Sequence, residues 1–246
     1  MKKGIFAALI LIFSLFSLFG QQTISDIVAS PSKDSSKTEK ESFFSSIDKS
    51  LFFTLGPRLL VNTDSSTGSA PSPICYSFGL GGDFLFQNGF LLEGQASFFT
   101  NYYLWDGEKA RPAEVENRTA TALSSMIDFC CGYSWVKGQN QSHYISLMGG
   151  TGIFLRYGLL SSGVSGDDPN RNGQSTASQD LSDINSSFYS KANFLYQQIA
   201  FSYSYKMSDF WKIGGEFRFY IPVGSIISGD GMDGAMFSLS LKLNYR

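Results

Sequence analysis

The stretch FSLSLKLNYR, residues 237–246, alternates large apolar side chains with polar ones over its whole length. Successive side chains of a β-strand point to opposite faces, so the pattern predicts a strand with one apolar face and one polar face. The apolar face requires either a protein core or lipid beside it, because exposed hydrocarbon is unfavourable in water. The rest of the sequence decides between these two environments.

The composition argues against a nucleic-acid-binding protein. The 246 residues include 19 Lys and Arg against 21 Asp and Glu, a formal net charge of −2, so no basic stripe is available for phosphates. Charged residues make up only 16% of the chain and aromatic residues 15%, whereas an average soluble domain is roughly 25% charged. The chain therefore has fewer charged residues than an average soluble domain, and it is rich in aromatic residues.

The first 48 residues predict a secreted protein. MKK followed by the apolar run 5–19 is typical of a signal peptide, which we expect over residues 1–20 with cleavage after about Gly20. An uncleaved membrane anchor is the alternative, but the run is short for the about 20 residues that a spanning helix needs. Residues 21–48 are rich in Ser, Lys, Asp and Glu, and we expect a flexible periplasmic segment there.

Residues 49–246 divide into eight segments in which apolar and polar side chains alternate. These segments are 51–61, 73–86, 90–104, 119–135, 142–157, 187–205, 211–222 and 237–246. They run about 11 residues or more, near the roughly 9–11 residues with which a tilted strand crosses a bilayer and longer than the usual 5–6 of globular sheets. Asn88-Gly89 predicts a type I′ hairpin turn. A phase slip near Gln197-Gln198 predicts a bulge in the sixth segment.

The connections between these segments differ in length in a regular way. Short turns are expected at 87–89, 136–141 and 206–210, and long polar loops at 62–72, 105–118, 158–186 and 223–234. Short turns on one side and long loops on the other are typical of outer-membrane barrels. An even number of strands leaves both ends of the barrel segment on the short-turn side.

Aromatic residues cluster near the ends of the predicted strands, where they could form the two belts that lie at membrane interfaces. The predicted girdle comprises Trp105, Trp135, Tyr144, Trp211 and Tyr245. We therefore predict an all-β fold, an eight-stranded antiparallel up-and-down transmembrane β-barrel over residues 49–246, and we interpret the apolar face of 237–246 as lipid-facing.

With GGEFRFY (214–220) and an aromatic-containing last strand, residues 49–246 resemble the small outer-membrane barrels of Gram-negative bacteria, the class of OmpX, OmpW and the OmpA transmembrane domain. The resemblance implies a bacterial outer-membrane location and insertion by the barrel assembly machinery. Such barrels usually finish on an aromatic residue, whereas Arg246 follows Tyr245 here. Either the assembly machinery recognises an aromatic residue that lies before the last position, or this chain is inserted by a different assembly machinery.

The lumen of an eight-stranded barrel is just wide enough to be filled by side chains. Buried charges persist only when they are paired, so four inward cations and four inward anions predict a salt-bridged plug. The predicted network comprises Arg58, Asp83, Glu93, Asp128, Arg156, Glu216, Arg218 and Lys242.

Three functions follow from this architecture. The favoured one is a membrane scaffold that presents extracellular loops for envelope integrity, adhesion or host interaction. The second is a narrow OmpW-like channel for small apolar solutes, because several apolar side chains also point inward: Leu85, Leu91, Phe99, Met126 and Phe154. The third and least favoured is a lipid-modifying enzyme, since the single histidine, His143, adjoins a short turn far from the outer leaflet.

We expect no catalytic residue, no cofactor and no metal site. The three cysteines lack the CxxC spacing of a metal site, and the acidic loop residues lack the spacing of a calcium-binding loop. The expected partners are outer-membrane lipid, the assembly machinery and an extracellular or host ligand bound by the loops. We expect a monomer that binds no nucleic acid.

Overall fold

The structure is a computed structural model that describes residues 47–62, 73–138, 141–169, 175–229 and 232–246. Residues 47–246 form one compact unit. The signal peptide expected at 1–20 and nearly all of the segment expected at 21–48 lie outside the described residues. The first strand begins at Asp48, one residue before the predicted boundary.

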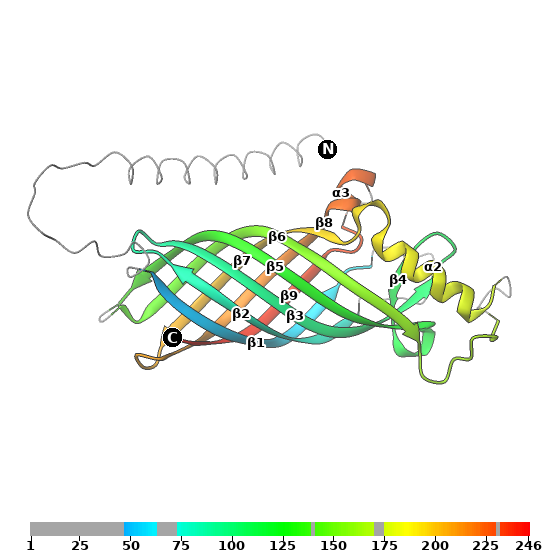
Figure 1. Ribbon diagram of the computed structural model, residues 1–246, viewed down its shortest axis with the longest axis horizontal. Helices are drawn as coiled ribbons and strands as arrows, with labels where there is room; N and C mark the ends of the chain where they lie inside the picture. Colours follow the sequence, from blue (N-terminus) through cyan, green and yellow to red (C-terminus); the bar gives the residue numbers. More distant parts are fainter. Residues whose placement is uncertain (1–46, 63–72, 139–140, 170–174, 230–231) are drawn as a thin grey trace, which may run out of the picture. The chain divides into compact units, whose positions relative to one another are not determined.

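Eight long strands close into an antiparallel barrel (Figure 1). They are β1 (Asp48–Leu60), β2 (Ile74–Leu85), β3 (Phe90–Trp105), β5 (Ala120–Lys137), β6 (His143–Leu160), β7 (Leu195–Lys206), β8 (Trp211–Pro222) and β9 (Met236–Tyr245). Neighbours in sequence pair in space, and the pairing of β1 with β9 closes the circle. The predicted eight-stranded up-and-down barrel is confirmed.

In β9 the apolar side chains are exposed and the polar ones are buried, which is the reverse of the pattern in a strand of a soluble protein. The side chains of Leu239 and Leu241 point outward and are 60% and 68% exposed, whereas Ser238, Ser240 and Lys242 are buried inside the barrel. The same alternation holds along the other barrel strands. An apolar outer face around a polar interior suits surrounding hydrocarbon, so the barrel has the surface of a membrane protein.

The two ends of the barrel differ (Figure 1). The turn end holds the β2–β3, β5–β6 and β7–β8 turns together with Asp48 and Tyr245. The loop end holds the four longer connections, which include β4 (Ala110–Ala113), α2 (Ala177–Tyr189), α3 (Val223–Ser228) and the short 3₁₀ helices Val115–Asn117 and Ser190–Ala192. Among the described residues, no helix is both long and apolar enough to cross a membrane.

The hairpin at Asn88-Gly89 forms, but the type I′ prediction was wrong. Only Gly89 has a positive φ, 89°, whereas a type I′ turn requires positive φ at both central residues. The N–H of Gly89 donates to the carbonyl of Phe86, and the N–H of Phe90 donates to the Asn88 side chain. The turn is therefore a three-residue loop with glycine in the left-handed position.

The predicted loops 105–118, 158–186 and 223–234 contain regular structure, which is α3 in the last of them. In 105–118, β4 pairs with residues Tyr102 to Trp105, so that β3 continues beyond the barrel rim as a short hairpin. In 158–186, β6 continues to Leu160, and α2 begins after a capping box in which the side chains of Thr176 and Gln179 each accept a backbone N–H. These segments build an ordered head on the loop end.

The predicted bulge near Gln197-Gln198 is also wrong. β7 begins at Leu195 and pairs with β6 in an uninterrupted register from Tyr205 to Leu195. The apparent phase slip arises because residues 187–189 belong to α2, where the side-chain period is 3.6 rather than 2. A helix end was read as the start of a strand.

We predict that Leu239→Arg strongly impairs membrane insertion and that Leu51→Arg impairs it much less. Both leucines point outward, but Leu51 pairs with Tyr245, about 20 Å along the strand from Leu239. A lipid-facing Arg costs about 2–4 kcal/mol at the bilayer midplane and about 0–1 kcal/mol near an interface. Urea titrations in lipid vesicles, read by the gel-mobility shift of the folded barrel, measure both variants. Equal losses would contradict the proposed membrane position.

Candidate functional site

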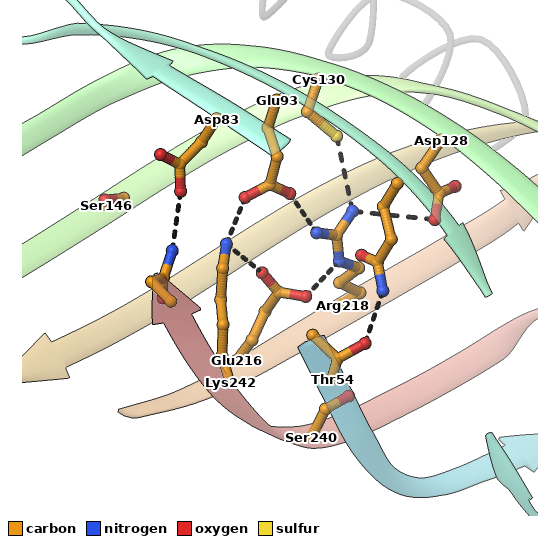
Figure 2. Close-up of polar contacts among 12 residues, drawn as sticks. Thr54, Asp83, Glu93, Asp128, Cys130, Ser146, Glu216, Arg218, Ser240 and Lys242 are labelled. Carbon is orange, nitrogen blue, oxygen red and sulfur yellow. Dashed lines mark hydrogen bonds and ion pairs between the residues drawn. The ribbon is translucent and has the colours of Figure 1, made fainter. Parts of the chain in front are cut away.

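The centre of the lumen holds a closed cycle of four buried charges, which we call the ion cycle: Glu93, Glu216, Arg218 and Lys242 (Figure 2). Each carboxylate contacts both cations. Nε of Arg218 lies 2.5 Å from Glu216, and Nζ of Lys242 lies 3.2 Å from the other oxygen of Glu216. Arg218 and Lys242 also both contact Glu93. All four side chains are at most 4% exposed, so water cannot replace these contacts.

Asp128 extends the ion cycle toward the loop end. Its carboxylate lies 3.7 Å from Nη1 of Arg218 and accepts hydrogen bonds from Tyr220 at 3.0 Å and Gln198 at 2.9 Å. The Gln198 carbonyl in turn accepts from Arg218 at 3.3 Å. Buried ions are stable only when such additional hydrogen bonds accompany the ion pairs. Among the described side chains, those of the ion cycle leave no buried nitrogen or oxygen without a partner.

Glycine makes room for these side chains. A Cβ at Gly152 would lie 2.7 Å from Oδ1 of Asp128, and a Cβ at Gly81 would lie 2.3 Å from the ring of Phe52. Phe52 itself lies under Lys242, whose Nζ is 3.9 Å from the ring centroid. Very small and large residues thus alternate around the centre of the lumen, and side chains fill it at this level.

Three of the eight predicted network residues lie apart from the ion cycle. Arg58 is buried between the rings of Phe99 and Tyr220 and donates to Ser97 at 3.0 Å. Its guanidinium makes no ion pair with any carboxylate of the described residues. The expectation that all four cations pair with carboxylates therefore does not match the structure at this position.

Asp83 and Arg156 depart from the predicted network for different reasons. Asp83 accepts hydrogen bonds from Ser50 at 2.6 Å and Asn244 at 2.9 Å, so neutral partners satisfy it. Asp128 pairs with Gly152 across β5 and β6, and Arg156 lies four residues beyond Gly152 along β6. Arg156 is therefore about 13 Å nearer the loop end than Asp128. Charged side chains that share the inward face, such as those of Arg156 and Asp128, are therefore kept apart when they lie at different heights along the barrel axis.

Two apolar clusters flank the ion cycle. The loop-side cluster comprises Leu60, Phe99, Met126, Phe154, Tyr196, Tyr220 and Met236. The wall cluster comprises Leu91, Cys130, Met148 and Ala200, with Leu85 packed against it. The ion cycle contacts the wall cluster, since Nη1 of Arg218 lies 3.8 Å from the sulfur of Cys130. Asp128 contacts the loop-side cluster, since it accepts a hydrogen bond from Tyr220. The inward apolar side chains expected to line a path belong to two separate clusters.

Two cavities lie at opposite ends of the lumen. The turn-end cavity measures about 30 Å³ and is lined by Lys242, Asp83 and several serines. The loop-end cavity measures about 140 Å³ and is lined partly by the loop-side cluster, through Leu60, Phe154 and Tyr196. The ion cycle and the loop-side cluster therefore separate the two cavities.

The loop-end cavity is the second candidate site, and sequence analysis missed it. Its walls come from the β3–β4 hairpin, β6, α2 and the β8–β9 connection. Tyr103 and Phe188 stack edge to face at 4.8 Å and anchor α2 to the hairpin. The capping box at Thr176 and Gln179, followed by apolar residues at helical spacing, was the sequence signal that could have revealed α2.

Acidic side chains hold the head of the loop end together. Asp233, in the β8–β9 connection, contacts Lys109 at 2.6 Å and Arg111 at 2.7 Å in the β3–β4 hairpin. Asp106 accepts from Nε of Arg111 at 2.6 Å and from the N–H groups of Glu108 and Lys109. Burial alone would raise the pKa of Asp106, but these hydrogen bonds outweigh it and hold the pKa below its usual value.

The predicted girdle residues do not all face lipid. Trp135, Trp211 and Tyr245 point outward at the turn end, are 42–50% exposed, and lie at the level expected for an interface belt. Trp105 instead packs against Tyr103, Phe188 and their neighbours in the head. Tyr144 lines the turn-end cavity, with Lys212 over its ring at 4.3 Å. Both lie on the inward face by the parity of their strands.

His143 lies at the turn end, where its Nδ1 contacts the hydroxyl of Tyr203 at 2.9 Å and its ring packs near Tyr205. No carboxylate of the described residues pairs with it. Within the same described residues, no group of three or more His, Cys, Asp or Glu side chains is arranged to hold a metal ion.

The sequence matches no protein-family model and no curated protein sequence. Among solved structures, the chain is similar to Neisserial surface protein A, with a TM-score of 0.50 and 8% identity over 81% of this chain and 97% of that one. This chain has the fold of a small outer-membrane β-barrel. The resemblance expected from the sequence is confirmed at the level of the fold.

Two further small outer-membrane barrels are similar at lower scores. OprG from Pseudomonas aeruginosa has a TM-score of 0.47 and 11% identity, covering 80% of this chain and 94% of that one. The attachment invasion locus protein Ail of Yersinia pestis has a TM-score of 0.44 and 9% identity, covering 80% and 96%. At these identities, the similarity concerns the course of the chain and not its side chains.

We predict that Arg218→Glu destabilises the barrel by about 3–5 kcal/mol, because it leaves Glu93 and Glu216 buried beside a third carboxylate. The temperature at which the folded barrel loses its gel-mobility shift should fall. Lys137→Glu is the matched control, since Lys137 is exposed at the turn end and makes no ion pair among the described residues. An Arg218→Glu barrel as heat-resistant as wild type would contradict the geometry of the ion cycle.

We predict that the β3–β4 turn opens only in acid. A carboxyl with a lowered folded-state pKa adds stability above its unfolded value of about 3.9, and this stability is lost as the pH falls through the folded value. Hydrogen exchange in 105–113, corrected for intrinsic rates, should therefore accelerate below about pH 4. In Asp106→Asn, exchange should be faster at pH 6 and depend less on pH. Opening of the wild-type turn between pH 7 and 5 would rule out Asp106 as the controlling group.

Proposed function

We propose that this protein is an outer-membrane scaffold with a closed lumen, whose ordered loop end binds a ligand outside the cell. The observation that carries the proposal is the closure of the lumen by the ion cycle and the loop-side cluster. A barrel that is filled in this way offers a stable support and not an aqueous path. The apolar outer face supports a membrane location.

The energetics of the lumen favour permanent closure. Opening a path would require moving Arg218 or Lys242 out of the cycle, and either change leaves Glu93 and Glu216 buried with one cation in place of two. Removing one partner from a buried ion pair costs about 3–5 kcal/mol, which is a large part of a typical free energy of folding. Only a small fraction of molecules would therefore be open at any time.

The loop end supports the binding role. β4, α2 and α3 give regular structure to the β3–β5, β6–β7 and β8–β9 connections, and ion pairs to Asp233 tie the β3–β4 hairpin to the β8–β9 connection. Binding surfaces are commonly carried by loops held on a rigid scaffold, because order before binding lowers the entropy cost of association. In the described part of the chain, the turn end has only short connections and offers no comparable surface.

A narrow channel for apolar solutes is less well supported. Its proposed lining includes Phe99, Met126 and Phe154 on one side of the ion cycle and Leu85 and Leu91 on the other. An apolar solute passing between these clusters would have to cross the charged groups of Glu93 and Arg218. Desolvating those charges against hydrocarbon is unfavourable.

We predict that the wild-type barrel shows no steady conductance in planar bilayers, because no continuous water path crosses the ion cycle. Insertion is verified on the same preparation by the gel-mobility shift, and protein-free bilayers provide the blank. Arg218→Glu, which breaks the cycle, should give brief currents in part of the insertions. Large ohmic currents in every wild-type insertion would overturn the closed scaffold and favour the channel.

A further inference from the structure

We propose that the loop-end cavity binds a small ring-bearing carboxylate, of about the size of benzoate. This inference deepens the proposed function, on which it rests, by naming the class of ligand for the loop end. It depends on three properties of the cavity: its volume, the aromatic and aliphatic side chains that form part of its lining, and the cations around it.

The volume fits one ring. The cavity measures about 140 Å³, close to the about 150 Å³ of an apolar cavity that accommodates benzene. Three of its lining residues, Leu60, Phe154 and Tyr196, belong to the loop-side cluster, and Tyr103 and Phe188 add two more aromatic rings. A flat ring inserted among these side chains would bury apolar surface and stack on aromatic faces.

The cavity also carries an excess of positive charge. Among its described lining residues, Lys109, Arg111, Arg156 and Lys191 are cationic, whereas Glu108 and Asp233 are acidic. Lys109 and Arg111 both contact Asp233. Arg156 and Lys191 make no ion pair with any described carboxylate, so their charges are available to an anion.

Arg156 is held in place by neutral groups. Its guanidinium donates to the carbonyls of Phe188 at 3.0 Å and Asn193 at 2.9 Å, and it lies 4.4 Å from the ring centroids of both Phe154 and Phe188. These contacts fix the cation without neutralising it. A guanidinium that is half-buried, fixed and not neutralised attracts a carboxylate more strongly than an exposed guanidinium does.

Lys191 stands on the rim of the same cavity. It is exposed and has a φ of 49°, and Ala192 follows with a φ of 59°. Such left-handed conformations are unfavourable for residues other than glycine and persist when the surroundings hold them. Here the carbonyl of the next residue, Asn193, accepts from Arg156. This hydrogen bond joins Arg156 to the segment that carries Lys191, and both cations line the same cavity, where they are available to the acid group of a ligand whose ring enters it.

The test uses the purified barrel in zwitterionic nanodiscs at pH 7 and fluorine NMR of 4-fluorobenzoate, with empty nanodiscs as background. We expect saturable binding of 4-fluorobenzoate. Fluoroacetate, which lacks the ring, and 4-fluorobenzyl alcohol, which lacks the charge, should each bind at least about tenfold more weakly. Equal binding of fluoroacetate would overturn the ring requirement, and equal binding of the alcohol would overturn the charge requirement.

Variants then locate the site. Arg156→Gln should weaken 4-fluorobenzoate binding about tenfold and Lys191→Gln about threefold, whereas Lys137→Gln at the turn end should leave it unchanged. Folding of each variant is checked by the gel-mobility shift. If Arg156→Gln does not fold, Lys191→Gln decides, and unchanged affinity would overturn the site. Absence of saturable binding together with absence of conductance would reject the ligand class and leave the closed scaffold standing.

Discussion

The constraint on which the rest of the structure depends is the closure of the sheet between β1 and β9. In hydrocarbon, each backbone N–H or C=O without a partner costs several kcal/mol, roughly, so a sheet can span a membrane only if it has no edge. Closing with eight strands leaves a lumen that side chains fill. The polar groups at the centre of the lumen, such as those of the ion cycle, are then removed from water and need partners within the barrel.

The ion cycle is one solution to this requirement, and it in turn specifies the register of the strands. Glu93 comes from β3, Glu216 and Arg218 from β8, and Lys242 from β9. A slip of one residue in any of these strands would turn its charge toward lipid and its apolar face toward the lumen. The same contacts that fill the lumen thus disfavour alternative pairings. Arg58 meets the requirement only in part: two aromatic rings and one serine contact its guanidinium, whereas its Nε and Nη1 have no hydrogen-bond partner among the described residues.

The two ends of the barrel differ in the length and structure of their connections. At the turn end, connections are short, and Trp211 and Tyr245 pack together at 4.9 Å on the outer face. At the loop end, β4, α2 and α3 surround a cavity whose cations outnumber its acids among the described lining residues. Because the closed lumen separates them, a ligand bound at the loop end would act at the surface and not as a transported solute.

The sequence by itself determined the barrel. Strict alternation in eight segments, as in FSLSLKLNYR, assigns each side chain to lipid or lumen without reference to any other strand, because the period of a strand is two. It did not determine which inward charges meet. Arg156 and Asp128 share the inward face, but only the register of β5 with β6 sets them about 13 Å apart. Likewise, the packing of α2 against the β3–β4 hairpin and the loop-end cavity depend on contacts between segments distant in sequence, which only the tertiary structure decides.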